Sequence, residues 1–249
     1  MKDNSWEQYG KENPYFAVCT DPRYKTDNLN EAALQEFFES GEGDVKTVLS
    51  QINDYFSNAN INSFKNVLDF GCGTGRILIP FAQRFEHVLG IDISTGMLKE
   101  AAKNISDRGL NNVSLIQSED INTIEFKDSF DLVHTYIVLQ HIPVDMGYKI
   151  IDKLISLIRK DGFGMIHFTY ANPLSPYREK KMRFKAKHWW YYQLSNLLKG
   201  RKANTPLMQM NNYDLKVVFE ILKKYHLRQV SIDFTDHGGY LGLKLYIKK

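Results

Sequence analysis

The chain has 249 residues, of which 32 are basic and 29 acidic, and its formal net charge is +3 at pH 7. This length suits one α/β domain, and a hydrophobic share of 43% is enough for a sizeable core. Because no stretch reaches the ~20 apolar residues of a membrane span and the first residues lack an apolar signal region, we expect a cytoplasmic protein.

Charge is distributed unevenly along the chain. Residues 1–60 carry 5 basic and 11 acidic side chains, whereas residues 171–249 carry 16 basic and 5 acidic ones. The first 60 residues are predicted to be helical, with one helix over 31–39 and a second that Asp44 caps and that runs to Tyr55. We expect them to form a cap on a domain that spans residues 61–249.

A glycine-rich turn follows an apolar segment at 67–70. The segment holds Asp69, and the turn places Gly71, Gly73 and Gly75 at every second position before an apolar helical pattern. This order indicates a strand, a tight turn and a helix N-terminus, where unpaired N–H groups favour an anion. Asp69 adds a negative charge beside that site, so an amino-acid group would suit it.

The spacing of these glycines separates several families. Dinucleotide-binding loops place a third glycine where this chain has Arg76, and no Gly-Lys-Ser/Thr ending follows. The D-x-G-x-G-x-G loop resembles motif I of the class I S-adenosylmethionine-dependent methyltransferases. Cys72 lies inside the loop, where a small thiol packed under a cofactor is a better interpretation than a disulfide with Cys19.

Three further segments extend the resemblance. A predicted strand at 87–92 ends in Asp92, about 20 positions after the glycine loop, where a carboxylate suits ribose hydroxyls, and Ser94 is a helix N-cap. Next come a strand at 113–116 and a strand at 130–135, the latter followed by the Leu-x-His-Ile-Pro segment 139–143. The resemblance covers residues 65–170.

The remaining elements complete the predicted fold. We expect a helix over 145–159, a fifth strand over 163–170 after an Asp161-Gly162 turn, and a last helix over 212–225 capped by Asn212. Two strands over 228–235 and 240–247 follow it. The fold implied is an α/β class with a seven-stranded, mostly parallel, doubly wound sheet. Residues 171–211 form a helical insertion before the last helix.

The resemblance implies S-adenosyl-L-methionine as the cofactor. We expect no metal, because no pair of Cys or His has the spacing of a zinc site and no paired carboxylate motif is found. The family places a carboxylate against the adenine amino group, for which Asp120 matches better than the neighbouring Glu119; either charge could equally be a solvated loop residue. The cofactor residues predicted in this way are Asp69, Gly71, Cys72, Gly73, Gly75, Arg76, Asp92, Ile93, Met97, Glu119, Asp120, Ile121 and Thr135.

The methyl acceptor is less defined. The preferred acceptor is a hydroxyl of a small molecule, sugar-like or phosphorylated, and N-methylation or RNA methylation are alternatives. A hydroxyl benefits from a general base, for which His141 is the first candidate and His237 the second. A structural histidine and a tight Gly-Gly hairpin are the respective alternatives.

Substrate residues are expected from the cap, from the segment after the fourth strand and from the insertion. The apolar segment 14–18 is either a packed arm or a lid that touches substrate. The predicted substrate residues are Tyr15, Phe16, Tyr136, Gln140, Arg178, Trp189 and Trp190.

The insertion interleaves basic and aromatic residues between positions 178 and 202. Such a segment could bind a phosphorylated acceptor, an anionic membrane surface or nucleic acid, or could be a solvated cap. Nucleic acid is the least favoured partner, because the overall charge is nearly balanced. Two other classes stay open: an NAD-dependent oxidoreductase, which the glycine spacing disfavours, and a non-catalytic protein that binds S-adenosylmethionine.

Overall fold

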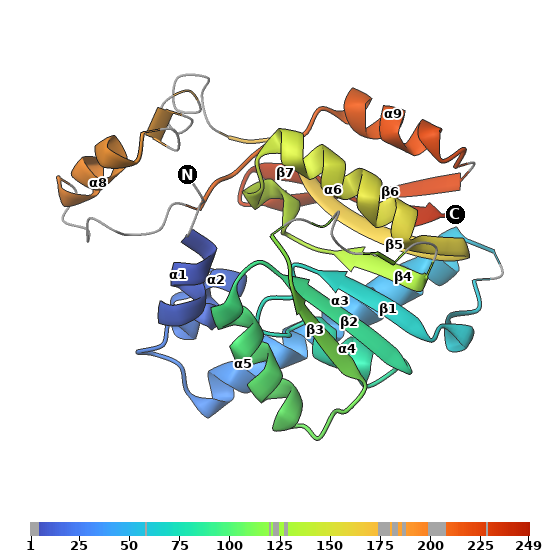
Figure 1. Ribbon diagram of the computed structural model, residues 1–249, viewed down its shortest axis with the longest axis horizontal. Coiled ribbons are helices and arrows are strands. Elements are labelled where there is room, and N and C mark those ends of the chain that lie inside the picture. Colours follow the sequence, from blue (N-terminus) through green and yellow to red (C-terminus); the bar gives the residue numbers. More distant parts are fainter. Residues whose placement is uncertain are drawn as a thin grey trace.

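Seven strands form one mixed sheet in the order β3-β2-β1-β4-β5-β7-β6 (Figure 1). The computed structural model describes residues 5–57, 59–119, 121, 125–126, 129–173, 180, 184–185, 188–198, 208–227 and 229–249. The strands are β1 Asn66–Phe70, β2 His87–Asp92, β3 Val113–Gln117, β4 Phe130–Thr135, β5 Ile158–Ala171, β6 Gln229–His237 and β7 Tyr240–Lys248. Since β7 runs antiparallel to both neighbours and the other pairs are parallel, the predicted fold class is confirmed.

Helices cover both faces of the sheet. The described helices are α1 Ser5–Glu12, α2 Pro14–Val18, α3 Glu31–Tyr55, α4 Leu78–Ala82, α5 Thr95–Ser106, α6 Val144–Leu157, α8 Trp189–Leu197 and α9 Leu215–Lys224. One buried cluster joins α3, α4 and α5 to the sheet, and a second joins α6 and α9 to the opposite face. This three-layer arrangement buries both faces of the parallel strands, which explains their continuous apolar runs.

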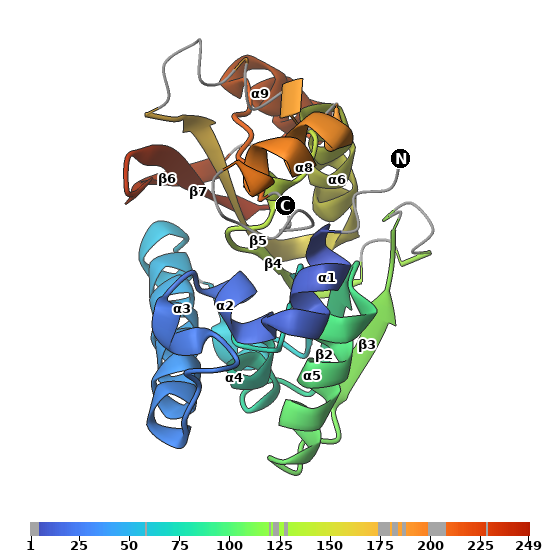
Figure 2. The same cartoon turned by 90° about the vertical axis from the view of Figure 1, so that its left-hand side faces the viewer.

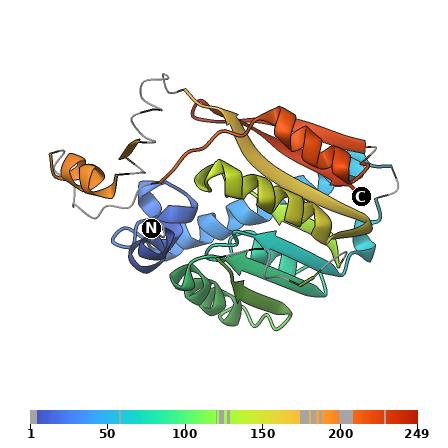
Figure 3. The ribbon, with the colours of Figure 1, turned by 45° about the horizontal axis from the view of Figure 1, so that its top comes forward.

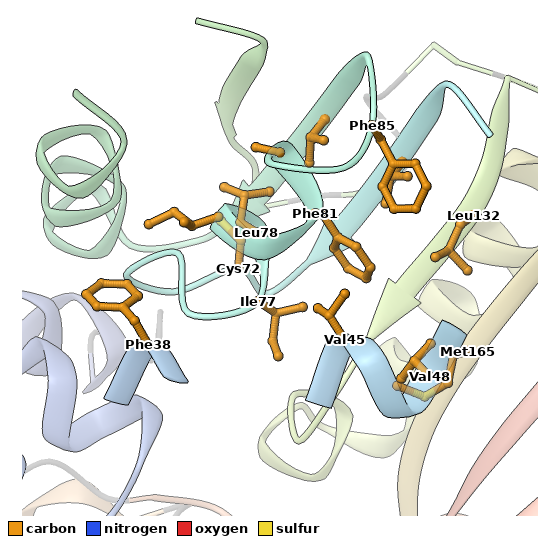
Figure 4. Close-up of a cluster of buried hydrophobic side chains, with 14 of the residues drawn as sticks. Phe38, Val45, Val48, Cys72, Ile77, Leu78, Phe81, Phe85, Leu132 and Met165 are labelled. Carbon is orange, nitrogen blue, oxygen red and sulfur yellow. The ribbon is translucent and has the colours of Figure 1, made fainter. Parts of the chain in front are cut away.

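The first of these clusters is the one that supports the glycine loop. Figure 4 shows Val45 and Val48 of α3 beside Phe81 of α4, with Leu132 of β4 and Met165 of β5 across from them. All five are essentially inaccessible to solvent. Helix α3 is therefore part of the core on this face, since its valines fill the space over β4 and β5.

The carboxyl ends of the parallel strands lie at one edge of the sheet, together with α1, α2 and α8 (Figures 1 and 3). Figure 2 looks onto this edge and shows α1 between α5 and α8. Helices α1 and α5 are in contact, because Gly10 lies so close to Ser94 and Met97 that an added Cβ would be 2.4 Å from the Ser94 hydroxyl.

Two predicted helix boundaries are wrong. Residues 31–55 form a single helix, so Asp44 is an interior residue and not an N-cap. The last helix begins at Leu215, where the Asp214 side chain accepts a hydrogen bond from the Lys216 amide, and Asn212 lies before it.

The fifth strand also differs from the prediction. It begins at Ile158, because Asp161 and Gly162 are part of the strand. Asp161 has a φ of +59°, and the pairing with β4 changes register between Phe130 and Leu132. By contrast, β2 and β4 have their predicted bounds, and Ser94 is the predicted N-cap, accepting from the Met97 amide at 3.1 Å.

Candidate functional site

The glycine loop turns sharply at the end of β1. Gly71, Gly73 and Gly75 have φ values of +75°, +53° and +92°, a region that only glycine adopts without strain. The Gly71 and Cys72 amides both donate to the Ile91 carbonyl, at 2.7 and 3.0 Å. The loop is thus attached to the end of β2 by its own backbone.

Two distant segments close on this loop. A Cβ added to Gly71 would lie 2.3 Å from a methyl group of Val138, in the segment after β4, and one added to Gly73 would lie 2.8 Å from a methyl group of Val18 in α2. Protein atoms of Val18 therefore lie in the space that a side chain at Gly73 would need. Close approach of protein, as well as positive φ, requires glycine here.

Asp92 lies beside the loop at the end of β2. One carboxylate oxygen accepts from the Ser94 amide and the other from the Gly73 amide, each at 2.9 Å. Burial raises the pKa of Asp92, and these amide bonds oppose that effect. A carboxylate has about four lone-pair sites, so further donors such as ribose hydroxyls can still be accepted. Ile93, the next residue, exposes 45% of its surface.

Asp69 has a partner that the sequence did not predict. Its carboxylate lies 2.8 Å from Nδ1 of His134, which is its neighbour in the β1–β4 pairing. Both side chains are buried, and Phe81 packs against the imidazole ring at 5.3 Å. Asp69 therefore faces β4 within the core, and the prediction that it offers an available charge beside the anion site is corrected.

The side chains of three other predicted cofactor residues contact protein groups or are buried in the core. Arg76 is turned toward α3, where its guanidinium donates to Asp44 at 2.7 Å and to Ser40 at 3.1 Å. The Met97 side chain is buried in the core. Cys72 is buried with a free thiol, as predicted, and desolvation raises its pKa well above its usual value.

The remaining predicted cofactor residues lie after β3 and β4. Glu119 is exposed and Ile121 is buried, whereas Asp120 lies outside the described residues. Thr135 ends β4 with a buried hydroxyl that has no hydrogen-bond partner. The hydroxyl of Thr74, in the glycine loop, is in the same situation.

The segment after β4 has an unusual backbone. Ile137 has a φ of +57°, which is rare for a β-branched residue, and its amide donates to Nδ1 of His167 at 3.3 Å. The short helix Leu139–His141 follows. Strain of this kind persists only where the surrounding structure holds it, and it concentrates at functional sites.

His141 lies at the end of that short helix. Its Nδ1 donates to the Gln209 carbonyl at 2.7 Å, because a carbonyl only accepts, so Nε2 carries the lone pair. Nε2 lies 3.3 Å from the Gln140 amide nitrogen, and the Trp6 ring of α1 lies 5.0 Å from the imidazole. Burial lowers the pKa of His141 to about 4, so the ring is neutral at pH 7.

A second group of rings lies where β5, β6 and β7 reach the same edge. Tyr136 is 5.1 Å from His167 and 6.1 Å from His237, and the two imidazoles are 5.4 Å apart. Nε2 of His167 donates to the Thr235 hydroxyl at 3.0 Å, since Nδ1 already accepts from Ile137. Lys244 lies over the Tyr136 ring, with Nζ 4.9 Å from its centre.

The electrostatics of this ring group favour neutral imidazoles. Burial lowers the pKa of His167 to about 3 and, together with Lys244, lowers the pKa of His237. Burial also raises the pKa of Tyr136 to about 12. Nε2 of His237 is buried and has no hydrogen-bond partner among the described residues.

The predicted substrate residues of the N-terminal segment are buried or partly buried, whereas Trp190 of the insertion is exposed. Tyr15 is buried against Phe37 and donates to Asn104 at 3.0 Å, which supports the packed-arm interpretation for this residue. Phe16 is partly buried, with Lys25 over its ring. Trp190 is 65% exposed on α8, whereas Arg178 and the Trp189 side chain lie outside the described part of the chain.

Sequence reasoning missed several residues at this edge. His134, His167, Thr235 and Lys244 are interior or strand residues, and Trp6 comes from the first helix. Strand alternation could have placed His134 opposite Asp69, but no local pattern marks the others. Among the described residues no group of three or more His, Cys, Asp or Glu side chains is arranged to hold a metal ion.

Comparison with known proteins finds a family model and several relatives that are similar to parts of this chain. Residues 67–162 match the family model described as a methyltransferase domain. Aklanonic acid methyltransferase DauC of Streptomyces sp. strain C5 is 47% identical over 73 residues, which are 28% of this chain and 33% of that protein. The ubiquinone biosynthesis O-methyltransferase of Aeromonas salmonicida is 28% identical over 137 residues, 53% of this chain and 56% of that one.

Other relatives are named as uracil-C5 methyltransferases of tRNA and 23S rRNA. The chain spans between 21% and 56% of the length of the first six curated relatives it matches. Among solved structures, magnesium protoporphyrin IX methyltransferase from Synechocystis PCC 6803 with bound SAM is similar over the whole of this chain and 98% of that one, with a TM-score of 0.61 and 18% identity. At that identity the likeness shows the fold.

Proposed function

We propose that the protein, whose residues 67–162 match the methyltransferase domain family, transfers the methyl group of S-adenosylmethionine to a hydroxyl of a small-molecule acceptor. The observation that carries the proposal is the glycine loop attached to Asp92. The Gly73 amide donates to the carboxylate whose second oxygen accepts from Ser94, so the loop and the second strand form one rigid unit. A nucleoside bound there would meet a carboxylate that is already oriented.

The residues present fit this cofactor. Within the described part of the chain, buried oxygens without a hydrogen-bond partner include those of Thr74 in the loop, Thr135 at the end of β4 and Gln140 in the short helix after β4. Native proteins leave few such groups unsatisfied, and a polar ligand is one explanation for a cluster of them. We assign ribose binding to Asp92 and contacts with the methionine part to the loop of Gly71 to Gly75. Asp69 and Arg76 have other partners and receive a supporting role.

Catalysis would rest mainly on alignment. S-adenosylmethionine, when bound, supplies a methyl group on a good leaving group. The chain orients the acceptor opposite that methyl and excludes water, and such positioning contributes on the order of 7–11 kcal/mol in intramolecular reactions. The ring group of Tyr136, His167 and His237 offers an acceptor an aromatic surface that includes the unpartnered Nε2 of His237.

A base would be needed for a hydroxyl acceptor. His141 has the required form, since its bond to the Gln209 carbonyl holds Nδ1 protonated and leaves Nε2 as an acceptor. Its low pKa keeps it deprotonated at pH 7 but makes it a weak base. We propose His141 as the first base and His237, whose Nε2 is unpartnered, as the second.

Calorimetry and an acceptor screen test the proposal. S-adenosylmethionine and its demethylated product should bind, and NAD should not. A screen with radiolabelled S-adenosylmethionine against phenols, sugar phosphates, amines and tRNA should then label a hydroxyl compound. Tight NAD binding would overturn the cofactor assignment. Labelling of amines or tRNA would move the acceptor to nitrogen or RNA chemistry, and cofactor binding without any transfer would favour a non-catalytic role.

A further inference from the structure

Helix α8 carries large apolar side chains on its surface. Trp190, Leu194, Leu197 and Leu198 are 65%, 49%, 58% and 81% exposed. These positions follow i, i+4, i+7 and i+8, so at about 100° per residue they occupy an arc of about 100° on one side of the helix. An apolar stripe of this kind normally faces a core, but here it faces solvent.

The opposite side of α8 is the one that packs. Tyr192 and Asn196 are buried. Ser195 accepts a hydrogen bond from Lys185 at 2.8 Å, and the Lys185 ammonium lies 6.0 Å from the centre of the Tyr192 ring. The phenol of Tyr192 also lies near enough to Tyr9 of α1 to act on its charge. The helix is thus seated through one face, and its apolar stripe points outward.

The charge of the surrounding sequence is strongly positive. Between residues 178 and 202 the chain has nine basic side chains and one acidic one, Glu179. In the sequence, basic residues such as Lys180 precede the helix and Lys199 follows it, whereas the Lys185 ammonium lies on the packed face of α8. An exposed apolar stripe bracketed by basic residues is complementary to a surface that is apolar inside and anionic outside.

We propose that α8 docks on an anionic phospholipid bilayer, with its exposed stripe at the acyl boundary and with the excess positive charge of the sequence between 178 and 202 favouring anionic head groups. A bilayer fits better than RNA, because three of the four stripe residues are leucines, which do not stack on bases. No helix in the described residues has the length and apolar character to cross a bilayer, so the contact is peripheral.

The placement of α8 gives this contact a consequence. The helix lies at the same edge of the sheet as α1 and the carboxyl ends of the parallel strands (Figures 1 and 3). A bilayer against α8 would therefore face the edge that carries His141 and the ring group. Docking itself does not rest on the proposed methyl transfer.

Sedimentation with vesicles tests the proposal on the full chain. We expect the protein to sediment with phosphatidylcholine vesicles containing phosphatidylglycerol, and much less with pure phosphatidylcholine. The triple variant Leu194→Ser, Leu197→Ser, Leu198→Ser should lose at least tenfold in binding. Phe234→Ser, which changes a side chain 77% exposed on β6, is the matched control and should bind like wild type.

Circular dichroism and calorimetry with S-adenosylmethionine separate docking from folding and from the proposed function. The triple variant should retain its melting temperature and its affinity for S-adenosylmethionine. Wild-type sedimentation of the triple variant, equal binding to both kinds of vesicle, or no vesicle binding by wild type would each overturn the proposal. So would a gel-shift assay in which the triple variant loses binding to RNA and wild type ignores vesicles.

Discussion

The two halves of the functional edge are built in different ways. In the half that holds the glycine loop, the contacts that orient the Asp92 carboxylate join residues close in sequence: Asp92 accepts from an amide 19 positions earlier and from one two positions later. In the half beyond β4, His141 reaches Gln209 and His167 reaches Thr235, both 68 positions away. The Asp92 contacts therefore need only the β1–β2 part of the sheet, whereas the contacts of His141 and His167 need segments from the C-terminal part of the chain.

This difference has a physical cause. A loop that cradles a common cofactor uses amides and one carboxylate, so a short turn can provide everything it needs. A pocket for a particular acceptor needs side chains of several kinds, and the segment after β4 together with β5, β6 and β7 brings them together. Substitutions in the two halves should therefore fail differently.

The largest effect is expected for Gly71→Val. The new side chain would meet Val138 at 2.3 Å from its first carbon, at a φ of +75°. Strain and overpacking together should cost roughly 3–6 kcal/mol in free energy of unfolding, as measured by urea denaturation. Gly109→Val is the matched control, because Gly109 also has positive φ but nothing within 4 Å of its added Cβ. Equal losses in both variants would show that the Val138 contact is unimportant.

In the second half, His141→Gln should lower turnover by roughly 10²–10⁴-fold if His141 is the base. Affinity for S-adenosylmethionine should hardly change. Because its pKa is about 4, the wild-type base stays deprotonated above that pH, and the deficit of the variant should shrink at high pH as the acceptor hydroxyl ionises unaided. A constant deficit across the pH–rate profile would remove His141 from this role and leave His237.

Asp92→Ala should weaken binding of S-adenosylmethionine by roughly 1.5–3 kcal/mol, the range for hydrogen bonds to a charged group. Calorimetry measures this loss, and a thermal melt is needed beside it because the Gly73 and Ser94 amides lose their acceptor. Asp145→Ala, on the exposed first turn of α6, is the control. Unchanged affinity in a folded Asp92 variant would contradict the ribose assignment.

The smallest effect concerns acid stability. His141 is protonated in the unfolded chain below a pKa of about 6.5 but in the folded protein only below about 4, so the unfolded state binds more protons between these values. Stability is therefore complete above pH 6.5 and falls as the pH drops, by about 2 kcal/mol at pH 5 for this group. Melts of wild type and His141→Gln at pH 7 and 5 should show a shallower fall in the variant. Identical falls would indicate that the ring is solvated.

Much of the fold could be predicted because the strands carry period-two or continuous apolar patterns and the turns carry glycine. The break expected before Asp44 was wrong for a tertiary reason. Gly41 ordinarily weakens a helix, but here an added Cβ would be 2.0 Å from the Arg76 carbonyl, so glycine permits α3 to pack closely on the loop. No local pattern shows that a glycine serves another segment.

The positions of some site residues could also be predicted from the sequence, whereas the partners of others could not. Asp92 and Ser94 lie where spacing from the glycine loop places them, since one turn of chain fixes their position. Arg76 instead pairs with Asp44 on α3, and Asp69 contacts His134 on β4. A buried charged group needs a hydrogen-bonding partner, and here tertiary structure provides it. The His167 and His237 contacts depend on the pairing of β5, β7 and β6, which a single sequence does not specify.

Ile137 shows how the edge is kept ready for use. A φ of +57° at a β-branched residue costs on the order of 1–3 kcal/mol in folding free energy, and the packing around it must offset this cost. The hydrogen bond from its amide to the His167 side chain connects this strained residue to β5. The scaffold consequently preorganises this turn. An incoming acceptor would then bind without losing affinity to the ordering of the turn.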